Sequence, residues 1–135
     1  MLFNVSPLTA QDWLPTRIVG IDYPVLAIQA RISGRVRIKC LLDENGKVLS
    51  TEILELSGTS KGLRDLLGKA AQENAAQWSF SRSTSVKEEQ PSIVITYDFE
   101  FQTKANPAYL RSKFIFDFPH SVHVVAEIPT IQITK

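Results

Sequence analysis

The chain has 135 residues, of which 44% are hydrophobic, and its 15 basic and 14 acidic residues leave a formal net charge of +1. This length fits one domain with a buried core. The balanced charge argues against a dedicated nucleic-acid-binding protein, which usually has a strongly basic surface. The one cysteine, Cys40, excludes an internal disulfide and a metal site built from several cysteines. The sequence contains no apolar run of about 18 residues that would predict a membrane span, and its N-terminus lacks the features of a signal peptide.

Two short segments precede the first clear strand pattern. Residues 1–17 contain Pro7 and Pro15 and are expected to form an irregular N-terminal arm. Tyr23-Pro24 then opens an apolar pattern that predicts a helix over about residues 24–32, because proline is favoured in the first turn of a helix. Gly34 is expected to follow its end.

Residues 35–56 have the pattern of a β-hairpin. Apolar and polar residues alternate over 35–42, which predicts a half-buried strand whose outer face carries Arg35, Arg37 and Lys39. Asn45-Gly46 favours a tight turn, and residues 47–56 return as a second strand. The alternation in this second strand slips once, which indicates a bulge.

A one-sided helix and a third strand follow. Apolar and small residues recur within residues 57–80 at the spacing of a helix with one buried face; they are Leu63, Leu66, Leu67, Ala70, Ala71, Asn74, Ala75 and Trp78. The polar segment 79–87 is expected to form turns. Residues 92–101 alternate strictly and predict a strand.

This order of elements predicts an α+β fold, with two helices packed on one face of a small antiparallel sheet. We expect a domain over residues 18–104, between the arm 1–17 and a C-terminal extension 105–135. The extension has β-prone pieces at 114–118, 122–127 and 130–134 and is expected to form strands. An open sheet edge is usually covered, so one of the first two pieces is expected to pair with strand 92–101, either in the same chain or swapped into a neighbouring copy.

The sequence offers no constellation typical of catalysis. His120 and His123 could share a metal, but no third ligand lies close in sequence, so two solvated histidines are the favoured interpretation. Cys40 is expected to be a buried apolar residue rather than a nucleophile. The basic row Arg35, Arg37 and Lys39 is expected to be an exposed strand face, with a patch for acidic polymers as the less favoured alternative. We therefore expect no enzyme activity, no catalytic residue, no metal and no cofactor.

Several short motifs between Ile18 and Phe101 occur in a characteristic order. They are Tyr23-Pro24, Arg31-Ile32-x-Gly34-x-Val36, Asn45-Gly46-x-Val48, Ser57-Gly58, Ala70-Ala71 and Trp78-x-Phe80, followed by the apolar strand 93–101. In this order the chain resembles the C-terminal domain of TonB, the periplasmic energy transducer of bacterial envelopes. The membrane anchor and Pro-rich spacer of that family are absent from this sequence.

The resemblance implies an interaction module that couples inner-membrane energy to outer-membrane transporters. Its partner would be a TonB-box-like peptide that adds as a strand to the sheet edge formed by residues 92–101. The partner-binding residues implied in this way are Tyr23, Pro24, Ser92, Val94, Thr96, Asp98 and Glu100. The resemblance also implies a periplasmic location, with a membrane reached only through the missing anchor, and no nucleic-acid partner. The alternatives are a self-associating module, such as a homodimer, or an envelope scaffold or sensor without a transport role, and a cytoplasmic location if Met1 is the native start.

Overall fold

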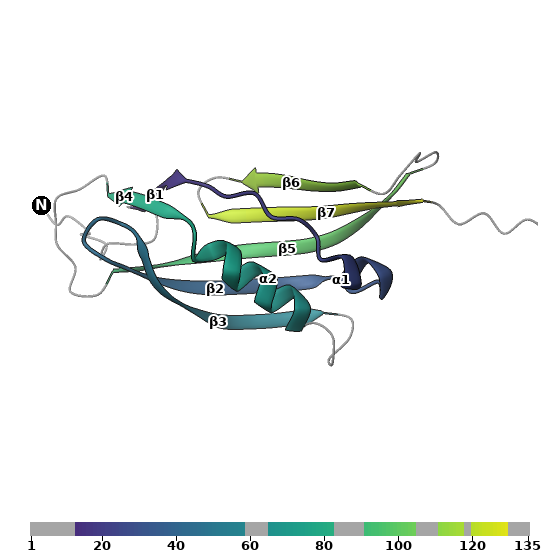
Figure 1. Cartoon of the computed structure of the whole chain (residues 1–135), viewed down its shortest axis with the longest axis horizontal. Coiled ribbons are helices and arrows are strands. Elements are labelled where there is room, and N and C mark those ends of the chain that lie inside the picture. The colour runs from purple at the N-terminus through teal and green to yellow at the C-terminus, as the bar shows by residue number, and fades with distance from the viewer. Residues whose placement is uncertain (1–12, 59–64, 83–90, 105–110, 118–119, 130–135) are drawn as a thin grey trace, which may run out of the picture.

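The computed structural model describes residues 13–58, 65–82, 91–104, 111–117 and 120–129. These residues form a layer of strands covered on one face by helices and by a short two-stranded ribbon (Figure 1). The elements are β1 (Trp13–Arg17), α1 (Val25–Gln29), β2 (Gly34–Leu42), β3 (Val48–Gly58), α2 (Asp65–Ala75), β4 (Ser79–Arg82), β5 (Ser92–Lys104), β6 (Arg111–Asp117) and β7 (Ser121–Pro129).

The main sheet has five strands in the order β3-β2-β5-β7-β6. The pairs β2–β3, β2–β5 and β6–β7 are antiparallel, as predicted for the hairpin and for the strand after α2. The pair β5–β7 is parallel, so the sheet is mixed and the predicted purely antiparallel sheet is wrong at this pair. The difference arises because β6 carries the chain back along the outer side of the sheet before β7 begins, as Figure 1 shows.

The predicted bulge in the second strand is confirmed, and β3 contains two. The register of β3 against β2 shifts once between Arg37 and Ile38 and once between Leu41 and Leu42. Each shift leaves one residue of β3 without a partner on β2, namely Leu54 and Leu49. Both leucines are exposed, and they lie on a strand at the edge of the sheet. The bulges make this edge irregular, which hinders the addition of a further strand.

The longer helix, α2, covers the half of the sheet that contains β2 and β3. Figure 1 shows α2 lying across β2 and β3, and its apolar residues Leu67, Ala71 and Ala75 are buried there. The predicted start of this helix lies outside the described residues. The first helix, α1, is shorter than predicted, because Arg31 has a φ of 57°, in the left-handed region that ends a helix. Neither helix in the described parts of the chain has the length and apolar character needed to cross a bilayer.

Two segments that were expected to be irregular form strands. Residues Trp13–Arg17 of the N-terminal arm are β1, and residues Ser79–Arg82 of the expected turn region are β4. They pair with each other antiparallel, and we call this pair the β1–β4 ribbon. Trp13 and Phe80 anchor the ribbon in the core, since they are 2% and 1% exposed. The alternation of a strand this short is too brief to recognise in the sequence, particularly with Pro15 inside β1.

The C-terminal extension completes the sheet. The predicted pairing of an extension segment with strand 92–101 is confirmed within the same chain, because β7 pairs with β5 from Thr96 to Lys104. The inward residues Val122, Val124 and Ala126 belong to the same buried cluster as the helices and the ribbon. The third predicted piece, residues 130–134, lies outside the described residues.

Candidate functional site

The strand β5 is the candidate site, and β2 and β7 lie on either side of it. The backbone N–H of Thr96 donates a 2.9 Å hydrogen bond to the carbonyl of His120, so its polar groups face β7. Successive residues of a strand direct their backbone groups to opposite sides, and β5 pairs with β2 without a register shift. Hence Ser92, Val94, Asp98 and Glu100 also direct their backbone groups toward the β7 side.

The sheet edge that the family resemblance assigns to a partner strand is occupied by β7 over most of the length of β5. Thr96, Asp98 and Glu100 lie opposite Ser121, His123 and Val125 of β7. Ser92 and Val94 precede the start of this pairing, and no strand among the described residues runs beside them on that side. Within the part of the chain that the structure describes, the outer side of β5 is therefore divided into a covered part from Thr96 onward and an uncovered part before it.

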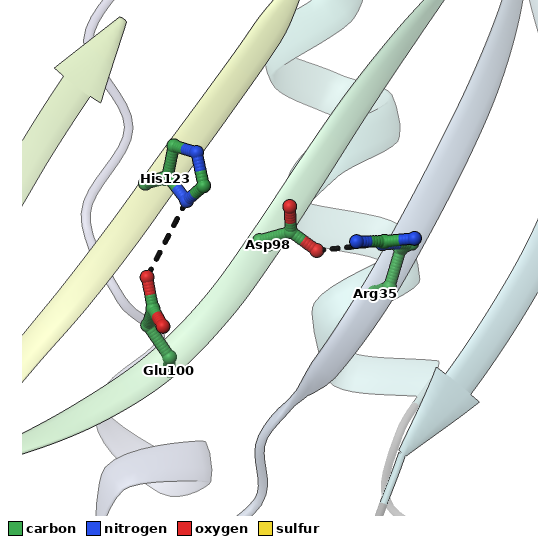
Figure 2. A network of polar contacts seen from close by, with 4 residues as sticks. All are labelled: Arg35, Asp98, Glu100 and His123. Carbon is green, nitrogen blue, oxygen red and sulfur yellow. Dashed lines mark hydrogen bonds and ion pairs between the residues drawn. The ribbon is translucent and has the colours of Figure 1, made fainter. Parts of the chain in front are cut away.

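The open face of the sheet is polar where β2, β5 and β7 meet (Figure 2). The Arg35 Nε lies 2.7 Å from an oxygen of Asp98, and the His123 Nδ1 lies 3.3 Å from an oxygen of Glu100. Figure 2 shows these two pairs side by side, each joining two neighbouring strands. They border a pocket of about 430 Å³, which Ser33, Gly34, Phe99 and Phe101 also line.

The predicted basic row is matched by acidic residues in the register of the sheet. Arg35 pairs with Asp98, while Arg37 lies opposite Glu55 and Lys39 lies opposite Glu52. Opposite charges in facing positions stabilise a sheet by small amounts. This alternation of charge favours the interpretation of an exposed strand face over a patch for acidic polymers.

Tyr23, another predicted partner residue, lies at the opposite face of β5. Tyr23 is 2% exposed, and its ring stacks on Phe101 at 5.1 Å and meets the edge of Phe99 at 5.4 Å. Its hydroxyl donates to the carbonyl of Ile32. Burial, and secondarily Glu100, raise the pKa of Tyr23 far above its ordinary value. Pro24 is the residue before α1. Tyr23 thus supports the inner face of β5, whereas Asp98 and Glu100 lie on the outer face.

The remaining candidate residues have structural environments. Cys40 is fully buried, as expected, and burial raises the pKa of its thiol to about 12. The interpretation of two solvated histidines is wrong for His120, which is 8% exposed and packs against Phe80 in the core. His123 instead lies on the open face beside Glu100, so the two rings do not converge on one metal. The described residues contain no group of three or more potential ligands placed to hold a metal.

Residues 19–103 match the family model of the Gram-negative bacterial TonB protein C-terminal domain. The chain belongs to this family. The match includes α1, α2 and β2–β5 and stops before β6 and β7. A search of curated proteins finds no match. Among solved structures, the chain is similar to the solution NMR structure of the Pseudomonas aeruginosa TonB C-terminal domain, with 24% identity, a TM-score of 0.46, and coverage of 64% of this chain and 84% of that chain.

Membership of the TonB C-terminal family confirms the resemblance seen in the sequence. The family is a non-catalytic energy-transducing domain that interacts with outer-membrane transporters. Sequence reasoning missed two features of the candidate site: the parallel direction of the strand that pairs with β5, and the role of His120 just before that strand. The alternation of Val122, Val124 and Ala126 is the signal that identifies β7 as a strand, but no local pattern encodes its direction or its neighbour.

Proposed function

We propose that this TonB-family domain binds an extended segment of an outer-membrane transporter as a parallel strand on β5, in the place that β7 occupies. The proposal includes a periplasmic location, which accords with the family. The observation that carries it is the parallel pairing of β5 with β7 from Thr96 to Lys104. It supports the proposal because the backbone groups on this side of β5 pair with a parallel strand, which here comes from the same chain.

The uncovered part of β5 provides a starting point for the partner. The backbone groups of Ser92 and Val94 face the side on which β7 has not yet begun. An extended peptide that pairs there can advance along Thr96 and Asp98 as β7 separates. Backbone pairing supplies affinity that does not depend on side chains, as in other cases of strand addition.

The side chains of β7 indicate which residues such a partner strand needs. Its inward positions replace Val122, Val124 and Ala126, which are 0–1% exposed, so small or β-branched apolar residues are required. One of its outward positions replaces His123, which faces Glu100. We therefore expect a peptide with small apolar residues at alternate positions and, in the place of His123, a polar or basic residue whose side chain reaches Glu100.

A proline substitution in β5 tests the proposal. Val94→Pro removes the outward N–H of Val94 while leaving the bonds between β5 and β2 in place. We expect the substituted full chain to remain folded and to lose binding in a titration with N-terminal peptides of outer-membrane transporters. Val94→Ala is the matched control, because it shortens the same side chain and keeps the N–H. Equal binding by the Val94→Pro and Val94→Ala proteins would contradict the proposal, and binding of none of these peptides by the unmodified chain would favour the self-association alternative.

A further inference from the structure

We infer that the β1–β4 ribbon controls access to the outer side of β5 by holding the start of β7 in place. That this control regulates the binding of a partner strand rests on the proposed function. The coupling between the ribbon and β5 does not rest on it.

His120 connects the ribbon to β5. It lies immediately before β7, and its carbonyl accepts the hydrogen bond from the Thr96 N–H of β5 at 2.9 Å. Its side-chain Nε2 donates to the backbone carbonyl of Trp13 in β1 at 2.8 Å. One buried residue therefore contacts both the strand whose edge is covered and the ribbon.

Both strands of the ribbon contribute to this contact. The Phe80 ring of β4 lies 6.0 Å from the His120 ring, and Pro15 of β1 is the register partner of Phe80. The guanidinium of Arg82 lies over the ring of Trp13, 5.1 Å from its centroid. This contact joins β4 to β1 at a second register pair. Trp78, just before β4, lies 5.8 Å from Phe116 of β6. The ribbon and the residue before it thus contact β6 and the residue that precedes β7.

The position of this contact determines what its loss would expose. Pairing of β7 with β5 begins at Thr96, next to the uncovered residues Ser92 and Val94. If β7 separates from this end, Thr96 and Asp98 join Ser92 and Val94 in one continuous outer edge.

A cross-link within the ribbon tests the coupling in the full chain. Leu14 and Ser81 are exposed register partners in β1 and β4, and residues directly opposite each other in an antiparallel pair are close enough for a disulfide. In the Leu14→Cys, Ser81→Cys protein we expect slower amide exchange of Thr96 and Asp98 in the oxidised state than in the reduced state. The amides of Ile95 and Tyr97, which face β2, serve as internal controls. A matched control places cysteines at Leu41 and Ser50, which pair β2 with β3 on the far side of β5.

A substitution of His120 weakens the contact between the ribbon and the start of β7. His120→Phe keeps a ring against Phe80 and removes the hydrogen bond to Trp13. We expect exchange at Thr96 and Asp98 to accelerate about tenfold, the factor associated with loss of one net hydrogen bond, with little change at Ile95 and Tyr97. Unchanged exchange at Thr96 and Asp98 in both experiments overturns the inference. So does an equal change at all four amides, or an equal effect of the control disulfide, because either result would indicate global stabilisation or destabilisation.

A peptide that copies residues 120–129 separates this inference from the proposed function. Tighter binding of the peptide to the His120→Phe protein than to the unmodified chain supports both. If the ribbon variants alter exchange as expected but neither protein binds the peptide, the coupling stands and strand addition on β5 fails.

Discussion

The indole N–H of Trp78 donates a 2.9 Å hydrogen bond to the side-chain oxygen of Asn74, one helical turn earlier in the chain. The same oxygen accepts a 2.8 Å hydrogen bond from the hydroxyl of Tyr97 on β5. The amide nitrogen of Asn74 donates to the carbonyls of Val19 and Gly20, at 2.9 and 3.2 Å. A single buried amide therefore joins α2, the segment after β1, and β5.

Asn74→Ala is expected to destabilise the protein strongly. It leaves the Trp78 N–H and the Tyr97 hydroxyl without their acceptor, and each unsatisfied buried group costs about 1–3 kcal/mol. We expect a loss of about 3 kcal/mol or more in the free energy of unfolding, measured by urea denaturation. Gln72→Ala on the same helix is the control and removes one hydrogen bond, to the carbonyl of Thr51, so about 1 kcal/mol is expected. Equal losses for the two variants would contradict the central role given to Asn74.

Gly46→Ala is expected to disturb the support of the ribbon. Gly46 has a φ of 83°, and an added Cβ would lie 1.7 Å from the carbonyl oxygen of Phe80. Its own carbonyl accepts the N–H of Phe80 at 2.8 Å, so the turn between β2 and β3 holds β4. We expect a clear fall in melting temperature for Gly46→Ala and little change for Gly20→Ala, since nothing lies within 4 Å of a Cβ added at Gly20. Similar melting temperatures for the two variants would show that the turn does not hold β4.

The burial of His120 predicts a loss of stability in mild acid. Burial lowers the pKa of His120 below its ordinary value of 6.5, in spite of the hydrogen bond to Trp13. As the pH falls below 6.5, the unfolded chain therefore binds a proton that the folded chain resists. The contribution of His120 to the free energy of unfolding is constant above pH 6.5. Between pH 6.5 and the folded pKa it decreases by at most about 1.4 kcal/mol for each unit that the pH falls.

His120→Phe removes this contribution and retains all other titrating groups. Urea denaturation at about pH 7.5 and about pH 5.5 measures the difference for each protein. We expect a smaller decrease for the His120→Phe protein than for the unmodified chain. The same decrease in both proteins would mean that His120 is not the buried group responsible.

The sequence predicts those elements whose patterns are long. The alternation in β2 and β5, the Asn45-Gly46 turn and the apolar face of α2 are local signals, and the structure contains each of these elements. The ribbon was missed because β1 and β4 have only 5 and 4 residues, and their stability comes from contacts of Trp13 and Phe80 with distant parts of the chain. The parallel direction of β7 and the burial of His120 depend on contacts between residues far apart in sequence, which no window of residues encodes.

The same reasoning applies to the candidate site. Alternate residues of the predicted strand 92–101 direct their backbone groups away from β2, and Thr96 shows this directly in its bond to His120. Their role in partner binding stays a prediction. The family motif implies Tyr23 as a partner-binding residue, whereas the structure buries its ring against Phe99 and Phe101. The extension was correctly predicted to cover β5. Because Val122, Val124 and Ala126 belong to the core, removal of the whole extension would damage the fold, and experiments on access to β5 require the full chain.

The central claim is that a partner strand takes the place of β7 on β5. Its most direct test is an NMR titration of the ¹⁵N-labelled full chain with an N-terminal peptide of an outer-membrane transporter, with amide exchange measured in the bound state. We predict shift changes at Ser92, Val94, Thr96 and Asp98, together with loss of exchange protection at the β7 amides of Val122 and Val124. Shift changes confined to the outer edges of β3 or β6, with β7 still protected, would contradict the account.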